Sequence, residues 1–156
     1  KKLQGFDVRV LAYDKYNPDR IPAGVIKCDD LSIIYNEADI VSFHVPYQTD
    51  TIHYFSKEFV GAMKKPFILI NTSRGAVVDT AALLKGMDSG KVTGACLDVF
   101  DQEPVSTMNT AVSGHLHERL KHPDIVVTPH IAGYTFEALY KMSKALLDKI
   151  SAQIMS

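Results

Sequence analysis

The chain has 156 residues, of which 46% are hydrophobic and 22% are charged, and its formal net charge is −1. This composition is typical of one globular domain and excludes a disordered or fibrous protein. The balanced charge, without a run of basic residues, argues against a nucleic-acid or membrane-surface partner, and no apolar stretch approaches the roughly 20 residues of a membrane span. We therefore expect a cytoplasmic protein whose partner is a small molecule.

Short runs of β-branched and apolar residues alternate with segments that are compatible with helices. The predicted strands are Val8–Tyr13, Gly24–Cys28, Ile40–Val45, Phe67–Asn71, Gly94–Val99 and Ile125–Thr128. The predicted helices are Leu31–Asn36, Lys57–Met63, Thr80–Ser89 and Thr135–Met155, and residues 106–121 are expected to form a loop with a short helix. This alternation predicts βαβ units and a parallel sheet with helices on both faces.

The cysteines and the clustered histidines carry little chemistry. Cys28 and Cys96 lie inside apolar runs, so we expect buried free thiols. His117 and His122 are one residue too far apart for the HExxH spacing that places two zinc ligands on one helix face. We therefore expect no metal.

An acidic residue, Asp14, ends the first predicted strand. In a doubly wound sheet the ligand lies across the carboxyl ends of the strands, and an acidic residue there can accept hydrogen bonds from both hydroxyls of an adenosine ribose. The alternative is that Asp14 only begins a turn toward Asn17. The next residue, Lys15, is a cation that could pair with a 2′-phosphate, so the sequence does not exclude NADP as the cofactor.

The segment Asn71–Gly75 follows the fourth predicted strand and contains small polar residues, one arginine and one glycine. The planar guanidinium of Arg74 suits a carboxylate that is bound through two hydrogen bonds, which makes it a candidate substrate anchor. As an isolated pattern, it is also typical of a surface arginine in a turn.

Two further strand ends carry a carboxylate and a histidine. Asp98 lies in the fifth predicted strand, and His130 follows the sixth. A histidine at the edge of a sheet, beside a carboxylate from a neighbouring strand end, is a plausible general acid and base. The alternative is a histidine that packs behind Pro129.

Five segments matter most as an ordered set. They are Val-Leu-Ala-Tyr-Asp at 10–14, His-Val-Pro at 44–46, Ile-Asn-Thr-Ser-Arg-Gly-Ala-Val-Val-Asp at 70–79, Gly-Ala-Cys-Leu-Asp-Val-Phe-Asp-Gln-Glu-Pro at 94–104 and Thr-Pro-His-Ile-Ala-Gly-Tyr-Thr at 128–135. Together they resemble the D-isomer-specific 2-hydroxyacid dehydrogenase family. The resemblance implies that NAD is the cofactor, that a 2-hydroxy or 2-keto acid is the substrate, and that the enzyme is a homodimer.

The resemblance also implies a role for each matching residue. His130 would be the acid and base, Glu103 would orient it, and Arg74 would bind the substrate carboxylate. For the cofactor, Asp14 would hold the adenosine ribose and Asp98 would lie near the nicotinamide carboxamide. The remaining cofactor residues would be Val45 and Pro46 on the adenine side, with Thr72 and Ser73 approaching the cofactor.

One departure from the family pattern is large, because the glycine-rich turn GxGxxG and the strand before it do not occur in the chain. We therefore expect a Rossmann-type doubly wound parallel sheet that is incomplete at its N-terminal strand. Residues 1–133 would form a partial NAD-binding domain, and residues 134–156 a helix that belongs to the substrate domain or leads back to it. The alternatives are an NAD-sensing corepressor or scaffold of the same fold, or an inactive fragment of the enzyme.

Overall fold

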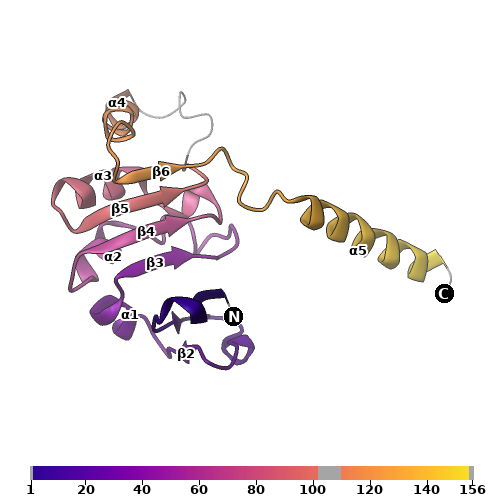
Figure 1. Ribbon diagram of the computed structural model, residues 1–156. Coiled ribbons are helices and arrows are strands. Elements are labelled where there is room, and N and C mark those ends of the chain that lie inside the picture. The colour runs from indigo at the N-terminus through magenta and orange to yellow at the C-terminus, as the bar shows by residue number, and fades with distance from the viewer. Residues whose placement is uncertain (1, 102–109, 155–156) are drawn as a thin grey trace.

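The computed structural model describes residues 2–101 and 110–154 (Figure 1). Its strands are β1 (Leu11–Ala12), β2 (Ile26–Lys27), β3 (Ile40–Phe43), β4 (Phe67–Asn71), β5 (Val92–Leu97) and β6 (Ile125–Val127). Its α-helices are α1 (Ser32–Glu37), α2 (Lys57–Ala62), α3 (Thr80–Asp88), α4 (Thr110–Arg119) and α5 (Phe136–Ile154), and short 3-10 helices span Lys2–Phe6, Pro18–Arg20 and Gly75–Val77. All the predicted strands and helices are present, and α4 is the short helix expected within residues 106–121.

The strands form two parallel sheets in the described part of the chain. One sheet pairs β1 with β2, and the other has the order β3-β4-β5-β6. The register of the larger sheet places Phe43 beside Asn71, Asn71 beside Leu97, and Leu97 beside Val127. The predicted parallel α/β architecture is therefore confirmed.

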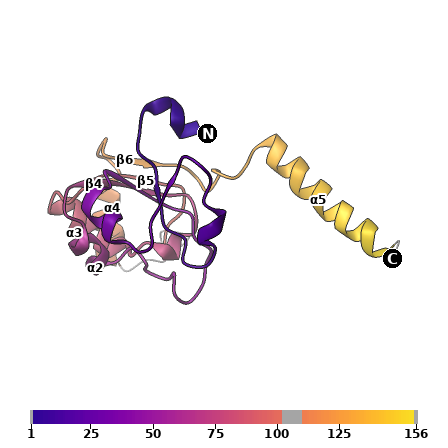
Figure 2. The ribbon, with the colours of Figure 1, turned by 90° about the horizontal axis from the view of Figure 1, so that it is seen from below.

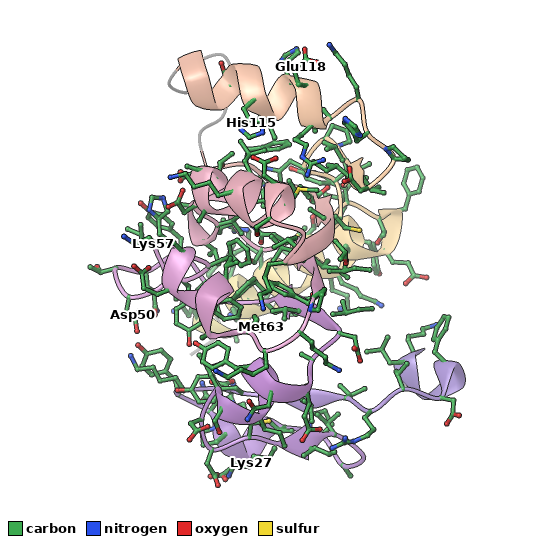
Figure 3. The ribbon with its side chains drawn as sticks, turned by 90° about the vertical axis from the view of Figure 1, so that its left-hand side faces the viewer. Lys27, Asp50, Lys57, Met63, His115 and Glu118 are labelled. Atoms are coloured by element: carbon green, nitrogen blue, oxygen red, sulfur yellow. The ribbon has the colours of Figure 1, made fainter. Side chains whose placement is uncertain are left out.

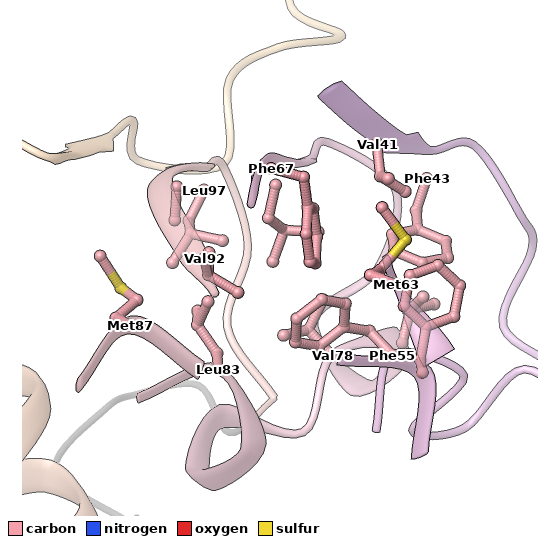
Figure 4. Packing of buried hydrophobic residues seen from close by; sticks show 14 of the residues in the cluster. Val41, Phe43, Phe55, Met63, Phe67, Val78, Leu83, Met87, Val92 and Leu97 are labelled. Atoms are coloured by element: carbon pink, nitrogen blue, oxygen red, sulfur yellow. The ribbon is translucent and has the colours of Figure 1, made fainter. Parts of the chain in front are cut away.

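The hydrophobic core lies between the larger sheet and helices α2 and α3. Aromatic residues dominate its β3 side, where Phe43, Phe55 and Phe59 pack with ring centroids 5.5–6.2 Å apart (Figure 4). Leu83 and Met87 of α3 cover the β5 side of the same cluster. The core is therefore continuous beneath β3, β4 and β5 and holds their carboxyl ends in fixed register.

The opposite face of this sheet differs from the expectation of helices on both faces. Ile68, Ile70 and Cys96 are only half-buried there, and Val126 is exposed. The connections from β3 to β6 all advance in one direction, and right-handed crossovers then place their helices on one side. Because this face is uncovered, the free thiol of Cys96 on β5 is half-buried rather than buried as expected. Cys28, which follows β2 of the smaller sheet, is a buried free thiol as expected.

A gap separates the two sheets on the side of β3 that faces away from β4. β1 and β3 share no ladder within the described residues, and Ile40 on β3 is 55% exposed. The common Rossmann strand order, 3-2-1-4-5-6, places a central strand between them, the strand that precedes the glycine-rich turn. The expected incompleteness of the sheet is thus visible as two separate sheets.

Helix α5 extends away from the rest of the molecule in both views (Figures 1 and 2). Its apolar residues recur at close to helical spacing, and Leu139, Leu146 and Ile150 are all exposed. Within residues 2–101 and 110–154, no helix has the length and apolarity needed to cross a membrane. The assignment of residues 134–156 to a substrate domain stays a prediction.

Candidate active site

The candidate residues that follow β3, β4, β5 and β6 lie at the edge of the larger sheet where its parallel strands end. The arrowheads of β3 to β6 point to the same side in Figure 1, and the register pairs the last residues of neighbouring strands. Consequently, the segments that begin at His44, Thr72, Asp98 and Thr128 lie side by side. This edge is where ligands bind in open α/β sheets.

The loop that carries Arg74 is built on a buried asparagine. The side chain of Asn71 donates to the carbonyl oxygen of Arg74 at 3.0 Å and accepts from the N–H and hydroxyl of Ser73 at 3.1 and 2.8 Å. Asn71 is fully buried, while Arg74 is exposed and donates to the carbonyl oxygen of Ser73 at 2.7 Å. The fold therefore fixes the backbone of the loop and leaves the guanidinium at the surface of the edge.

Gly75 joins this loop to the segment that follows β5. A Cβ atom at Gly75 would lie 1.5 Å from the carbonyl oxygen of Phe100 and 2.8 Å from the backbone nitrogen of Asp101. No side chain fits at those distances, so only glycine allows the two backbones to approach. This contact sets the position of the chain that leads toward Glu103.

His53, which the sequence indicates as a loop residue near the cofactor but not as one of its ligands, lies at the same edge. The Nε2 atom of His53 is 3.1 Å from Oδ2 of Asp101. The backbone of His53 has a φ of 51° and donates to the carbonyl oxygen of Ala76 at 2.7 Å. His53 therefore ties the loop before α2 to both the Gly75 loop and the β5 loop, a link between distant segments that no local motif indicates.

Asp98 anchors the loop of His130. Its buried carboxylate, 3% exposed, accepts a hydrogen bond from the hydroxyl of Thr128 and from the backbone N–H groups of Ile131 and Ala132, both at 2.9 Å. His130 lies between these donors, with a φ of 56°. Three hydrogen bonds to one carboxylate thus hold the backbone on both sides of the histidine.

The environment of Asp98 favours its ionised form. Burial raises the pKa of Asp98, but the hydrogen bonds from Thr128, Ala132 and Ile131 and the charge of His130 outweigh burial and lower that pKa below its ordinary value of 3.8. A depressed folded-state pKa adds stability that is present above the unfolded-state value and is lost as the pH falls toward the folded-state value.

We therefore expect Asp98→Asn to lower the free energy of unfolding by about 2–3 kcal/mol at neutral pH, because an amide cannot accept all three hydrogen bonds. The difference from the wild type should shrink below about pH 4, where the carboxylate is protonated in the unfolded state. Urea unfolding at several pH values measures it. Asp148→Asn, in an exposed pair with Lys144 on α5, is the control with little expected effect. An equal loss for both variants would contradict the anchoring role.

Asp14 follows strand β1 of the smaller sheet and begins a tight turn. Its Oδ1 atom accepts from the backbone N–H groups of Tyr16 and Asn17, both at 2.9 Å, and these hydrogen bonds lower its pKa. The side chain is exposed, and its other oxygen accepts no hydrogen bond from the described residues. The turn that the sequence offered as the alternative is therefore present, and ribose binding by Asp14 stays a prediction.

The remaining candidates are placed as follows. Val45 is half-buried and Pro46 is exposed after β3, while Thr72 is exposed and Ser73 is half-buried after β4. These residues flank one stretch of the edge, and their types fit a nucleotide that lies along it. Glu103 lies outside the described residues. Within the described part of the chain, no group of three or more histidine, cysteine or acidic side chains could hold a metal ion.

Comparison with known proteins gives one family model and several relatives of related activity. Residues 1–132 match the family model described as D-isomer specific 2-hydroxyacid dehydrogenase, NAD binding domain. The chain is 42% identical over 144 residues to the D-specific alpha-keto acid dehydrogenase of Enterococcus faecalis, covering 89% of this chain and 43% of that protein. It is 39% identical to the glyoxylate reductase of Thermofilum pendens over 147 residues, covering 92% of this chain and 41% of that protein.

Solved structures agree. The crystal structure of D-lactate dehydrogenase from Aquifex aeolicus, complexed with NAD and lactic acid, matches with a TM-score of 0.81 and 31% identity over 97% of this chain and 48% of that chain. An acyclic imino acid reductase in complex with NADPH and D-Arg matches with a TM-score of 0.77 and 26% identity, over 97% of this chain and 45% of that chain. The chain spans less than half the length of these relatives. With its parallel sheet and the family model matched over residues 1–132, the chain belongs to the D-isomer specific 2-hydroxyacid dehydrogenase family.

Proposed function

We propose that this chain supplies the NAD-binding and proton-transfer residues of an enzyme that interconverts a D-2-hydroxy acid and its 2-keto acid. The observation that carries the proposal is the arrangement of the sheet edge. The loops of Arg74 and His130 follow β4 and β6, with only β5 between them. Two strand spacings amount to about 10 Å, a separation that two long side chains can bridge around one small substrate.

Each residue then has a defined task. The guanidinium of Arg74 binds the substrate carboxylate through two hydrogen bonds and polarises the adjacent carbonyl. Protonated His130 donates its proton to the carbonyl oxygen during reduction and takes it back during oxidation. Glu103 orients His130 and stabilises its protonated form, by the resemblance to the family. The nicotinamide cofactor would supply the hydride as NADH in the reduction and would accept it as NAD in the oxidation.

Cofactor binding is assigned to residues that follow β1, β3 and β4. Asp14 accepts hydrogen bonds from the ribose hydroxyls, Val45 and Pro46 contact the adenine side, and Thr72 and Ser73 approach the cofactor near the Arg74 loop. Asp98 acts through the loop of His130 and, in the proposal, also lies near the carboxamide. The exposed apolar side of α5 supports the proposal that residues 134–156 pack on a substrate domain. A homodimer stays a prediction from the resemblance.

The test is steady-state reduction of a panel of 2-keto acids by the full-length protein with NADH, compared with its Arg74→Lys variant. Lysine keeps the charge but loses the two-pronged geometry, so we expect kcat/KM for the keto acid to fall by at least about 100-fold. The affinity for NADH, measured by fluorescence titration, should change little.

Near-normal turnover by the lysine variant would contradict the anchor role of Arg74. A wild type that binds NADH but reduces no keto acid would instead favour the dinucleotide-sensing alternative.

A further inference from the structure

A charged cluster joins the two sheets beside the candidate ribose site. The ammonium of Lys15 lies 2.8 Å from Oδ2 of Asp50, and the hydroxyl of Tyr16 donates to the same oxygen. Lys15 and Tyr16 directly follow Asp14, whereas Asp50 comes from the loop after β3 and is labelled in Figure 3. The cluster therefore spans the gap between the smaller sheet and the larger one.

Both sides of this cluster are held by local hydrogen bonds. The Asp14 carboxylate fixes the backbone of Tyr16 and Asn17 and so sets where Lys15 lies. On the other side, buried Thr51 donates to the carbonyl oxygen of Pro46 at 2.7 Å and accepts from the backbone N–H of Gln48 at 2.9 Å. Asp50 is thus presented by a closed turn, and its contact with Lys15 joins two ordered segments.

The charges at this point bear on which dinucleotide fits. A 2′-phosphate on the adenosine ribose would lie against Asp14 and would need a free cation nearby. Lys15 is the adjacent cation, but its ammonium is engaged by Asp50, and the hydrogen bond from Lys15 lowers the pKa of that carboxyl. Arg20 is a second cation on this side of the gap, and its charge lowers the pKa of Asp14.

We propose that Asp50 is a cofactor-selectivity residue, which occupies the ammonium of Lys15 and so withholds the cation that a 2′-phosphate at Asp14 would need. This inference rests on the proposed function, because it takes the ribose to lie at Asp14. It also bears on a question that the sequence leaves undecided, because a lysine directly after the acidic residue does not exclude NADP as the cofactor.

The test is calorimetric titration of NADH and NADPH into the full-length protein and its Asp50→Asn variant at low ionic strength. Asparagine keeps the shape of the side chain and removes its charge, which frees Lys15 for the phosphate. We expect the affinity for NADPH to rise about fivefold relative to NADH, the size of one exposed ion pair. Adding Lys15→Gln to Asp50→Asn should abolish the gain, and 0.5 M salt should reduce it.

Asp39→Asn is the matched control, because Asp39 forms an exposed 2.7 Å pair with Lys65 just before β3, at the opposite edge of the sheet. It changes the net charge equally and should leave the preference unaltered. Equal NADPH gains for the two variants, or an unchanged ratio in Asp50→Asn, would overturn the proposal. Asp50→Glu should keep the wild-type preference and guards against a folding defect.

If the folded wild type binds neither dinucleotide, the proposed function fails, and the proposal for Asp50 fails with it. If the wild type binds NADH and only the ratio of the two affinities does not respond to Asp50→Asn, the proposal for Asp50 alone fails.

Discussion

Replacing His130 with asparagine in the full-length protein should lower kcat for keto-acid reduction by about 10²- to 10⁴-fold, the usual contribution of a positioned general acid. Asparagine carries no titratable proton at neutral pH. It also tolerates the left-handed backbone that His130 adopts, with its φ of 56°. The hydrogen bonds from Ile131 and Ala132 to Asp98 should therefore survive, and the loss should fall on kcat, with NADH affinity nearly unchanged.

The control for this variant is His117→Asn, since His117 is an exposed histidine on α4. Its kcat should equal that of the wild type. If His130→Asn retained more than about a tenth of wild-type kcat, proton transfer would have to be assigned to another group, and His53 would be the first to examine.

Gly75→Ala should be the most damaging small substitution for the fold. An added Cβ would lie 1.5 Å from the carbonyl oxygen of Phe100 and 2.0 Å from its carbonyl carbon, and both belong to a backbone that cannot rotate away. We expect the free energy of unfolding to fall by about 3 kcal/mol or more, as measured by urea unfolding, because the Arg74 and Phe100 segments must separate.

Gly61→Ala provides the contrast. Gly61 lies in α2, and a Cβ there meets no atom within 4 Å. Alanine is the better helix former, so this variant should be more stable than the wild type by about 0.5–1 kcal/mol. Equal stability of the two alanine variants would show that the Gly75 contact is not a constraint.

The larger sheet was predictable because its signals are local. The predicted strand Phe67–Asn71 matches β4 and begins with four consecutive apolar residues, and Thr80 begins the predicted third helix just as it begins α3. The ordered motifs also placed Arg74 and His130 after strands of the same sheet, β4 and β6, which are separated only by β5. The first two strands were overestimated, since β1 and β2 each have only two paired residues beside the gap.

What escaped prediction are contacts between loops that are distant in the sequence. Asn71 supports Arg74 from within its own loop, but His53 meets Asp101 across 48 residues and Lys15 meets Asp50 across 35. Such pairs depend on the order of the strands in the sheet and on how closely two backbone segments approach, as they do at Gly75. The spacing of apolar residues along the sequence indicates neither. The hydrogen bonds from the His130 loop to Asp98 likewise appear only in the structure, and the place of Asp98 near the nicotinamide carboxamide stays a prediction.

Calorimetric titration of NADH into the full-length protein and into residues 1–156 alone tests the account most directly. The full-length protein should bind one NADH per chain. The isolated chain should show no appreciable binding, because β1 and β3 each keep one edge unpaired toward the gap among the described residues, and no glycine-rich turn brings a helix N-terminus to the pyrophosphate. Binding of equal affinity by the isolated chain would contradict the placement of the gap at the cofactor site, and no binding by the full-length protein would contradict the assignment of this edge to NAD.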